Sequence, residues 1–397
     1  MENNENLYLG IDIGTSKICV SICELKENSV LELKGVGTTV ANGINNTDVN
    51  KEELKLCILK AIQRAEQDSG YKSKKTFVNI PSQALEFTHN TGFLVSTSES
   101  GQISTKDQVE CIRRSKNIAV TSNKILLHAI PLFYKVDDTV VQNPVGVFGQ
   151  KLEVHSHLIF AKATVVNSIR DVLNSLGLYI NGMMFDNNAL KLIMANSEQR
   201  TKGCFLIDFG NSSTKVSFIK HDKIHKSLIL PIGSNILTQD LSKCLNTSIP
   251  EAERLKIIYA NVQIKPESKS TIIEITTKAD GKKEIDSILL NQIIQSRIKE
   301  LFIHIIKKFP ILTDEKYPVI LGGCGSLLNG LIPFFKENIN KNASNTILED
   351  LKPIIDSHSY TNAIGMIFYG LKTKTIKHVP IKVTLLKKCK QWVQKFY

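Results

Sequence analysis

The sequence predicts an α/β protein made of two related halves, with a separate α+β segment inserted in the first half. The main observation is a pattern that occurs twice, at residues 7–18 and 204–216: an apolar run, Asp-x-Gly, small hydroxyl residues, and a lysine leading into another apolar run. An apolar run that stops at glycine and then resumes predicts a strand, a tight turn and a second strand. After the first such hairpin, a helical pattern and another short strand follow, which is typical of an α/β sheet.

The two predicted turns have the chemistry of phosphate binding. Glycine lets the backbone bend close to a ligand, and turn N–H groups with nearby hydroxyls suit phosphate oxygens. An aspartate at the mouth of each turn, Asp12 and Asp208, suits a hydrated Mg²⁺ ion. Either hairpin alone is equally consistent with an ordinary solvated turn. The matched pair favours two half-domains that hold the phosphate tail of one nucleotide.

Composition narrows the class of protein. The 397 residues suffice for two or more domains with sizeable cores. The net charge of +12 is spread along the chain, without a zinc finger, an RNA-stacking motif or a basic helix-turn-helix, so no nucleic-acid partner is expected. No apolar run reaches the eighteen or so residues of a membrane span, and the polar, acidic N-terminus is not a secretory signal. The eight cysteines lack metal-site spacing, which indicates a reduced, cytoplasmic protein.

Periodicity predicts the elements of the first half. The helix at 51–69 has apolar residues at helical spacing, with Asp48 as its expected N-cap. The other predicted elements, in order, are strands at 7–13, 18–24, 31–38 and 76–80, a helix at 106–117, strands at 124–134 and 151–160, and a helix at 168–176.

The second half has a similar alternation of patterns. Its predicted elements, in order, are the hairpin at 203–219, a strand at 227–232, helices at 236–245 and 249–260, a β-like stretch at 271–276, a long amphipathic helix at 288–307 and a strand at 318–321.

Two further motifs carry candidate binding residues. Gly322 and Gly323 follow an apolar strand and lead to Ser326. Paired glycines let the backbone lie flat against a planar group, so this turn is either a floor under a purine or a simple strand-to-helix turn. Glu253 and Lys256 are three residues apart on one helical face. They either contact ribose and base or form an ordinary ion pair.

These motifs together resemble the actin/Hsp70/sugar-kinase superfamily, and within it the chain resembles FtsA, the bacterial cell-division actin homologue. The resemblance covers essentially the whole chain and rests on the order of its motifs. These are the hairpins at Asp12 and Asp208, Pro231-Ile-Gly-Ser-Asn-Ile-Leu-Thr-Gln-Asp240, Ala252-Glu-Arg-Leu-Lys-Ile257, Gly322-Gly323-x-Gly-Ser and Ala363-Ile-Gly-Met366. It implies an actin-like two-domain ATPase fold that binds ATP and Mg²⁺.

The resemblance also implies residue roles. Asp12 and Asp208 would bracket Mg²⁺ and the phosphates, and Glu253 and Lys256 would meet ribose and adenine. The residues implied to contact the nucleotide elsewhere are Gly14, Thr15, Ser16 and Lys17 in the first turn, Gly210, Asn211, Ser212 and Ser213 in the second, Gly233 and Asn235 at the cleft, and Gly322, Gly323 and Ser326 at the adenosine.

Some residues depart from the family's pattern. Asn211 and Ser212 place Cβ atoms where relatives have glycine, and Leu321 stands where a threonine often precedes the glycine pair. Asp186 falls near the position of a glutamate that orients water in many relatives, and Asn187 and Asn188 replace the usual proline and leucine. With Asp186 and Asp208 as the candidate catalytic residues, these departures predict ATP binding with weak or absent hydrolysis.

The resemblance also divides the chain into domains. The first half-domain is expected at 7–81 with 162–199 and 361–378, and the inserted FtsA-type subdomain at 82–161. The second half-domain is expected at 200–231 with 306–360, its upper subdomain at 232–305, and a membrane-targeting helix at 382–397.

The C-terminus has an amphipathic pattern of its own. Six apolar residues recur at i, i+1, i+4, i+7, i+8 and i+11, which spans an arc of about 120° on a helix. These predicted membrane-binding residues are Leu385, Leu386, Cys389, Trp392, Val393 and Phe396. Four lysines lie off that arc, as in helices that rest on an anionic membrane surface. The alternative is a last helix docked on the core.

The resemblance implies a function. A member of this family would bind ATP, polymerise with its own kind, bind the C-terminal peptide of the tubulin-like FtsZ, and tether the FtsZ ring to the cytoplasmic face of the inner membrane as a peripheral protein. Later division proteins would bind through residues 82–161. An FtsA-like pilus-assembly ATPase, which would lack the amphipathic tail, and a small-molecule kinase of the same superfamily are the alternatives.

Overall fold

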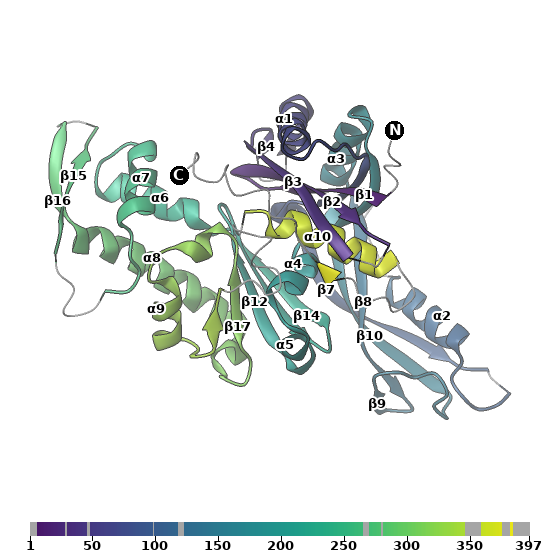
Figure 1. The fold of residues 1–397 in the computed structure, drawn as a ribbon. Coiled ribbons are helices and arrows are strands. Elements are labelled where there is room, and N and C mark those ends of the chain that lie inside the picture. The colour runs from purple at the N-terminus through teal and green to yellow at the C-terminus, as the bar shows by residue number, and fades with distance from the viewer. Residues whose placement is uncertain are drawn as a thin grey trace. The chain divides into compact units, whose positions relative to one another are not determined.

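The fold was analysed on a computed structural model that describes residues 6–27, 30–45, 48–97, 99–117, 123–264, 270–278, 281–345, 359–374 and 382–383. The chain forms two compact units (Figure 1). Unit 1 comprises residues 1–189, 219–227 and 362–397, and unit 2 comprises residues 190–218 and 228–361.

A six-stranded sheet forms the centre of unit 1, in the order β11-β6-β1-β2-β3-β19. Antiparallel pairing joins β1 to β2 and β2 to β3, whereas β6 runs parallel to β1 and β11 runs parallel to β6. The strands are β1 (Leu7–Ile13), β2 (Lys17–Leu25), β3 (Val30–Val40), β6 (Lys75–Asn79), β11 (Tyr179–Met184) and β19 (Lys382–Val383), with the short pair β4 (Ile44–Asn45) and β5 (Asp48–Val49) beside them. The predicted first hairpin is confirmed.

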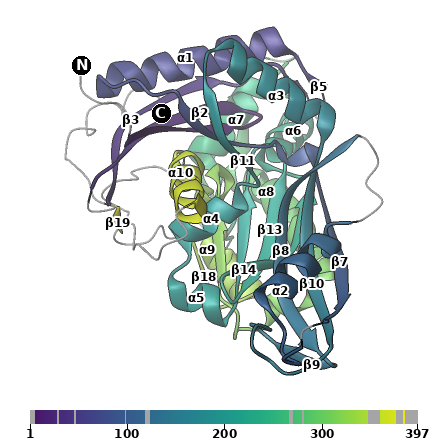
Figure 2. The same ribbon diagram turned by 90° about the vertical axis from the view of Figure 1, so that its right-hand side faces the viewer.

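Helix α1 (Lys51–Ser69) lies along strands β2 and β3 and buries its apolar face there (Figure 2). Its range is the predicted one, but the predicted N-cap is wrong. Asp48 lies in β5, and Asn50 caps the helix by accepting a hydrogen bond from the Glu53 N–H. The cap falls on Asn50 because the pairing of β4 with β5 keeps the chain extended through Val49.

The remaining helices of unit 1 were predicted less completely than α1. Strand β11 and the helices at Asn187–Met194 and Thr361–Lys374 had no counterpart among the predicted elements. Helix α3 begins five residues earlier than predicted, at Ala163 instead of Ser168. The helical elements are η2 (Ser82–Ala84), α3 (Ala163–Ser175), α4 (Asn187–Met194), which continues into unit 2, and α10 (Thr361–Lys374).

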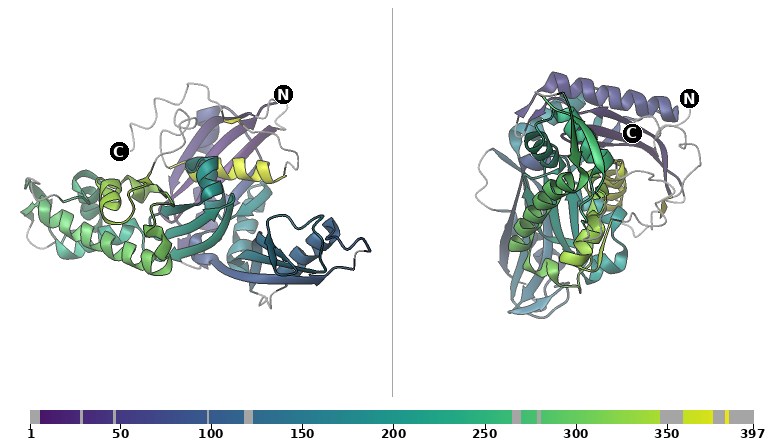
Figure 3. Two further views of the ribbon diagram at one scale, coloured as in Figure 1. Left: turned by 90° about the horizontal axis from the view of Figure 1, so that it is seen from below. Right: turned by 90° about the vertical axis from the view of Figure 1, so that its left-hand side faces the viewer.

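Residues 85–162 contain a second, four-stranded sheet in the order β7-β10-β8-β9. Helix α2 packs on β7 and β10 (Figure 3). It closes a small core around Cys111, Leu152 and Val154. The elements are β7 (Leu85–Val95), α2 (Thr105–Ser115), β8 (Lys124–Val136), β9 (Thr139–Val141) and β10 (Lys151–Lys162). The predicted α+β texture is confirmed, although the sequence did not predict β7.

A five-stranded sheet in the order β14-β13-β12-β17-β18 lies mainly in unit 2, although residues 219–227 at the end of β13 and in β14 belong to unit 1. Its strands are β12 (Cys204–Phe209), β13 (Thr214–Lys220), β14 (Lys223–Leu230), β17 (Val319–Gly322) and β18 (Ala343–Ser344). Strands β12 and β17 run parallel, which brings Asp208 level with Gly322. Strands β12 and β13 are neighbours in this sheet, so the second predicted hairpin is confirmed.

Helices α6 and α8 pack together beside this sheet, and α7 packs on α6. Their apolar faces join the sheet in one continuous core. The remaining elements of unit 2 are α5 (Ser197–Lys202), α6 (Ser234–Cys244), α7 (Ile249–Tyr259), β15 (Ile272–Thr276), β16 (Lys282–Asp286), α8 (Ser287–Lys308), η3 (Pro310–Thr313), η4 (Cys324–Leu327) and α9 (Leu331–Asn338).

Strand β19 corrects the predicted start of the C-terminal helix. Lys382 and Val383 pair in parallel with Val30 and Leu31 of β3, so these first two residues of the predicted 382–397 helix are strand. The edge of β3 offers unpaired backbone groups there, and a β-branched valine favours strand. The six predicted membrane-binding residues lie outside the described residues. No helix in the part of the chain that the structure describes is long and apolar enough to cross a membrane.

We predict that His157 makes unit 1 sensitive to acid. Burial, and secondly the neighbouring His89, lowers the pKa of His157 from 6.5 to about 3. Its ring lies 4.8 Å from that of His89 and 5.8 Å from that of Phe87. The folded state therefore keeps this histidine neutral, and its stabilising effect is complete above pH 6.5 and is lost as pH falls from 6.5 towards 3.

Between pH 7 and pH 5 this linkage costs about 2 kcal/mol of unfolding free energy. A His157→Phe variant should lose clearly less stability over that interval, measured as the urea midpoint by circular dichroism. His304→Phe, at a half-exposed position on α8, is the control and should behave as wild type. Equal losses in wild type and His157→Phe would contradict the prediction.

Candidate functional site

The turn of the first hairpin has the predicted geometry. The Gly14 N–H donates to the Lys17 carbonyl at 3.1 Å, so residues 14–17 form a tight turn between β1 and β2. Asp12 lies two residues before this turn, opposite Cys19 on β2, and is half-buried. Gly14, Thr15 and Lys17 are partly exposed and Ser16 is exposed. The four predicted phosphate-binding residues therefore lie together at one end of the sheet, within reach of solvent.

Asn79 holds this turn, and the sequence did not predict its role. The side chain lies at the end of β6 and is 3% exposed. Its Oδ1 accepts from the Ile13 N–H at 2.7 Å, and its Nδ2 donates to Asp12 Oδ1 at 2.9 Å and to the Ile13 carbonyl at 3.3 Å. Asn79 therefore fixes both the backbone beside the turn and the orientation of the Asp12 carboxylate. The only signal in the sequence is an amide between the apolar residues Val78 and Ile80.

The Ala363 motif of the sequence packs behind the same hairpin. Helix α10 passes so close to β1 that a Cβ on Gly10 would lie 1.9 Å from the Ala363 carbonyl oxygen. Only glycine allows this approach. The Ala363 motif therefore packs against the first hairpin. This contact explains why the sequence pattern includes both of these distant segments.

In unit 2 the second predicted turn is joined to the start of α6. The Gly210 N–H donates to the Ser213 carbonyl at 3.0 Å, which closes the turn. The Ser234 and Asn235 N–H groups then donate to the Gly210 and Asn211 carbonyls, both at 2.9 Å. A Cβ on Gly233 would lie 2.2 Å from the Asn211 carbonyl oxygen. The structure therefore brings the predicted residues of 210–213 and 233–235 together.

The turn also accommodates its two unusual residues. Among the described residues, positive φ angles occur at five non-glycine positions, and neither Asn211 nor Ser212 is one of them. An ordinary backbone conformation carries a Cβ without strain. The replacement of glycine at these positions is therefore compatible with the fold of the turn.

The glycine-rich segment after β17 lies against the same hairpin. Gly323 has φ 77°, and a Cβ there would lie 2.3 Å from Asp208 Oδ1 and 2.6 Å from the Phe209 carbonyl oxygen. Ser326 is buried, and its hydroxyl donates to the Gly323 carbonyl at 2.7 Å. Asp208 itself forms an ion pair with Lys215 at 2.6 Å. Residues 322–326 therefore lie directly beside the Asp208 carboxylate and form part of the same candidate site.

Glu253 and Lys256 form the ion pair that the sequence left as one of two alternatives. Lys256 Nζ lies 2.7 Å from Glu253 Oε2 and donates to the Thr238 hydroxyl at 2.9 Å and to the Ser234 carbonyl at 3.3 Å. Lys256 is only 8% exposed, whereas the Glu253 side chain is 44% exposed, so the pair joins a buried ammonium group to an exposed carboxylate. Its ammonium joins α7 to the first turn of α6, next to Asn235 and the 210–213 turn.

Asp186, the candidate catalytic residue, lies in the loop between β11 and α4 in unit 1. It is 2% exposed, and Asn187 and Asn188 beside it are also buried. The predicted site residues thus form two groups, residues 12–17 with Asp186 in unit 1, and Asp208, 210–213, 233–235, 253–256 and 322–326 in unit 2.

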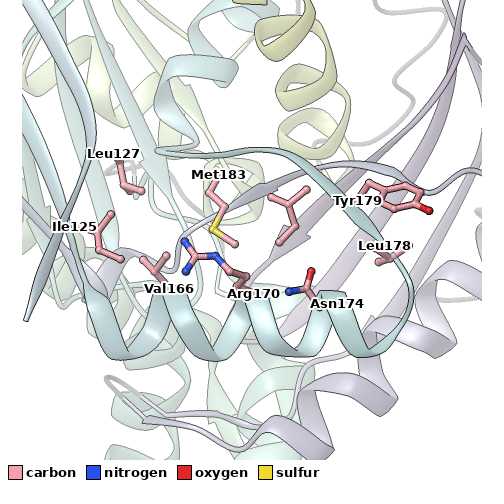
Figure 4. A pocket seen from close by; sticks show the side chains of 9 residues that line it. Ile125, Leu127, Val166, Arg170, Asn174, Leu178, Tyr179 and Met183 are labelled. Carbon is pink, nitrogen blue, oxygen red and sulfur yellow. The ribbon is translucent and has the colours of Figure 1, made fainter.

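Unit 1 also has a pocket of about 600 Å³ that contains none of the predicted site residues. Figure 4 shows Arg170 and Asn174 extending from α3 towards side chains of β8 and β11. The Arg170 guanidinium donates to Asn167 Oδ1 at 2.7 Å. The lining residues are Ile125, Leu127, Val166, Arg170, Asn174, Leu178, Tyr179, Ile180 and Met183.

Similar solved structures define the class of protein. A PilM–PilN type IV pilus biogenesis complex matches with a TM-score of 0.64 and 16% identity over 92% of this chain and 98% of that chain. MreB5 of Spiroplasma citri bound to ADP matches with a TM-score of 0.53 and 11% identity over 94% of this chain and 97% of that chain. With the two hairpins, these similarities show an actin-like ATPase fold.

Sequence comparisons identify the family. The model for "Cell division protein FtsA" matches residues 205–365, and the model for the "SHS2 domain inserted in FTSA" matches residues 83–160. The FtsA protein of Borreliella burgdorferi is 26% identical over 99% of this chain and 96% of its own length. That of Pseudomonas aeruginosa is 22% identical over 98% of this chain and 97% of its own length. The chain belongs to the FtsA family of cell-division proteins.

We predict that Asn79→Ala destabilises unit 1 and loosens Asp12. The variant loses three hydrogen bonds and leaves a buried Ile13 N–H without its partner, which should cost about 2–3 kcal/mol of unfolding free energy. Urea unfolding followed by circular dichroism measures the change. Asn167→Ala, which removes an exposed amide on α3, is the matched control and should change stability by less than about 0.5 kcal/mol. An Asn79→Ala variant as stable as this control would show that Asn79 does not hold the hairpin.

Proposed function

We propose that the protein binds ATP through the turns of the β1–β2 and β12–β13 hairpins. Membership of the FtsA family supports this, and the similar structure of MreB5 was determined with ADP bound. The observation that carries the proposal is the matching turn geometry, a 3.1 Å hydrogen bond from Gly14 to Lys17 and a 3.0 Å hydrogen bond from Gly210 to Ser213. Backbone N–H groups and hydroxyls gathered at such turns suit phosphate oxygens.

A divalent cation fits the surroundings of Asp12. The carboxylate is half-buried at the end of the sheet, and Asn79 orients it. Mg²⁺ in nucleotide sites is held by one or two carboxylates together with phosphate oxygens and water. When bound, the ion would neutralise charge on the phosphates, and Asp12 would orient it.

Replacing Asp12 should weaken ATP binding. Asp12→Ala removes the proposed metal ligand, and we expect a loss of at least tenfold in affinity for Mg-ATP, about 1.4 kcal/mol. Isothermal titration calorimetry with the full-length protein measures this affinity. Asp171→Ala on α3, whose carboxylate pairs with Lys51, removes a charge at a distant exposed position and serves as control. Equal affinities for wild type and Asp12→Ala would remove the first hairpin from the proposed site.

We propose that ATP hydrolysis is slow. Asp186, Asn187 and Asn188 are all buried, and Asn211 and Ser212 replace glycines of the second turn. A residue that orients water must reach the reacting centre closely, because small displacements cost much of the rate. Slow turnover suits a protein whose nucleotide controls assembly.

We further propose that the protein polymerises and tethers FtsZ to the cytoplasmic face of the inner membrane. Family membership and the amphipathic sequence of residues 384–397 support this proposal over an FtsA-like pilus-assembly ATPase, despite the fold similarity to PilM. A small-molecule kinase is not supported by the family. The exposed Ile257 and Ile258 of α7 offer apolar surface for the FtsZ C-terminal peptide, and exposed Phe93 and Phe148 offer the same for later division partners.

The tail should attach the protein to membranes. Removing residues 384–397, or the single change Trp392→Glu, should abolish co-sedimentation with anionic liposomes and leave ATP affinity unchanged, since apolar side chains and lysines of the tail carry membrane binding. Higher salt should weaken binding only in part, because the apolar contribution remains. FtsZ should pellet with liposomes only when the full-length protein is present. A truncated protein that pellets as well as the full chain would contradict the tether.

A further inference from the structure

The second hairpin contains a buried ion pair at the position where the sequence predicts a metal ligand. Lys215 Nζ lies 2.6 Å from Asp208 Oδ2, and the two side chains are only 10% and 4% exposed. The hydrogen bond from the Gly210 N–H to the Ser213 carbonyl closes the turn and pairs these two residues. Asp208 lies two residues before Gly210 and Lys215 lies two residues after Ser213, so they are opposite each other on neighbouring strands. Two charges buried this deeply require one another, because either alone would lack both water and a counter-charge.

The other carboxylate oxygen of Asp208 is covered by backbone. A Cβ on Gly323 would lie 2.3 Å from Asp208 Oδ1, so the chain of residues 322–326 passes directly over it. Mg²⁺ requires near-octahedral coordination at about 2.1 Å and keeps several waters. An enclosed carboxylate with an ammonium group against it has neither the space nor the net negative charge for such an ion. Asp208 therefore does not fit the role of a magnesium ligand.

The first hairpin provides an internal comparison. Its backbone is the same, yet the residue opposite Asp12 is the neutral Cys19. The Asp12 carboxylate is half-buried and not enclosed, and it accepts a hydrogen bond from the Asn79 amide. The two aspartates of the repeated motif thus occupy corresponding positions in chemically different surroundings.

We propose that the Lys215 ammonium takes the place of a metal ion at Asp208, so that the second half of the nucleotide site carries a built-in cation. This inference rests on the proposed binding of ATP. It assigns the divalent cation to the Asp12 side and to the phosphates alone. Because Lys215 neutralises Asp208, Mg²⁺ affects the affinity for ATP only through the Asp12 side and the phosphates.

The test compares ATP affinity in excess Mg²⁺ with that in EDTA, by isothermal titration calorimetry on the full-length protein. The ratio of the two affinities in the wild type is the reference and reflects the Asp12 side and the phosphates. In Lys215→Met this ratio should be at least tenfold larger, because the Asp208 carboxylate has lost its counter-charge and repels the phosphates most strongly when they carry no Mg²⁺. Lys220→Met, on the same strand away from the turn, is the matched control and should behave as wild type.

A double variant tests the same point without a buried unpaired charge. Lys215→Met combined with Asp208→Asn replaces the ion pair by a neutral pair of similar size, which protects the fold if Lys215→Met alone unfolds. Its ratio of affinities in Mg²⁺ and EDTA should equal that of the wild type, since no carboxylate remains at position 208 to repel phosphate, but it should bind ATP more weakly than wild type in both conditions. Thermal unfolding by circular dichroism checks that each variant is folded.

The outcomes separate this inference from the proposed function. A Lys215→Met variant whose ratio of affinities in Mg²⁺ and EDTA equals that of the wild type would overturn the built-in cation and leave ATP binding in place. A double variant that keeps wild-type affinity in EDTA would also overturn it. A wild type that binds no ATP in either condition would instead overturn the proposed nucleotide site.

Discussion

The structure depends on close approaches of backbone to backbone that only glycine permits. A Cβ on Gly10 would lie 1.9 Å from an oxygen of α10, and a Cβ on Gly233 would lie 2.2 Å from an oxygen of the 210–213 turn. Real atoms do not approach this closely, so any side chain at these positions would move a helix away from a hairpin. In both units the candidate turn is thus held from behind by a segment distant in sequence.

Segments whose apolar residues repeat with a regular period were predicted well. The roles of single polar residues inside strands could not be predicted in this way. The range of helix 51–69 was correct because its apolar residues repeat over five turns. Strand β7 was missed because its polar residues, among them Thr88, His89 and Asn90, obscure the alternation. Asn79 was missed because its hydrogen bonds join residues that are 66 and 67 positions apart. Such contacts follow from the fold and not from local sequence.

The two hairpins show the same limit in their electrostatics. The repeated Asp-x-Gly pattern correctly predicted two equivalent turns, because glycine and strand alternation determine backbone shape. It did not predict that Asp12 and Asp208 would differ, because their surroundings depend on the residues opposite them, Cys19 and Lys215. A motif therefore predicts where a carboxylate lies, whereas the residue opposite it on the neighbouring strand determines whether its charge is neutralised. One substitution on a neighbouring strand is enough to change the chemistry of a site whose backbone is unaltered.

The edge of strand β3 shows how the fold limits where the tail begins. Along its second half, side chains of α1 satisfy the backbone: Asp68 accepts from the Val36 N–H at 3.0 Å, and Arg64 donates to the Thr38 carbonyl. The first half, at Val30 and Leu31, is paired by β19. An exposed strand edge invites pairing with other chains, so covering it protects the protein from aggregation. Because consecutive Cα atoms are about 3.8 Å apart, the amphipathic sequence that follows Val383 starts at this edge and not at the end of a long linker. The proposed membrane-binding sequence is therefore joined directly to the edge of the central sheet of unit 1.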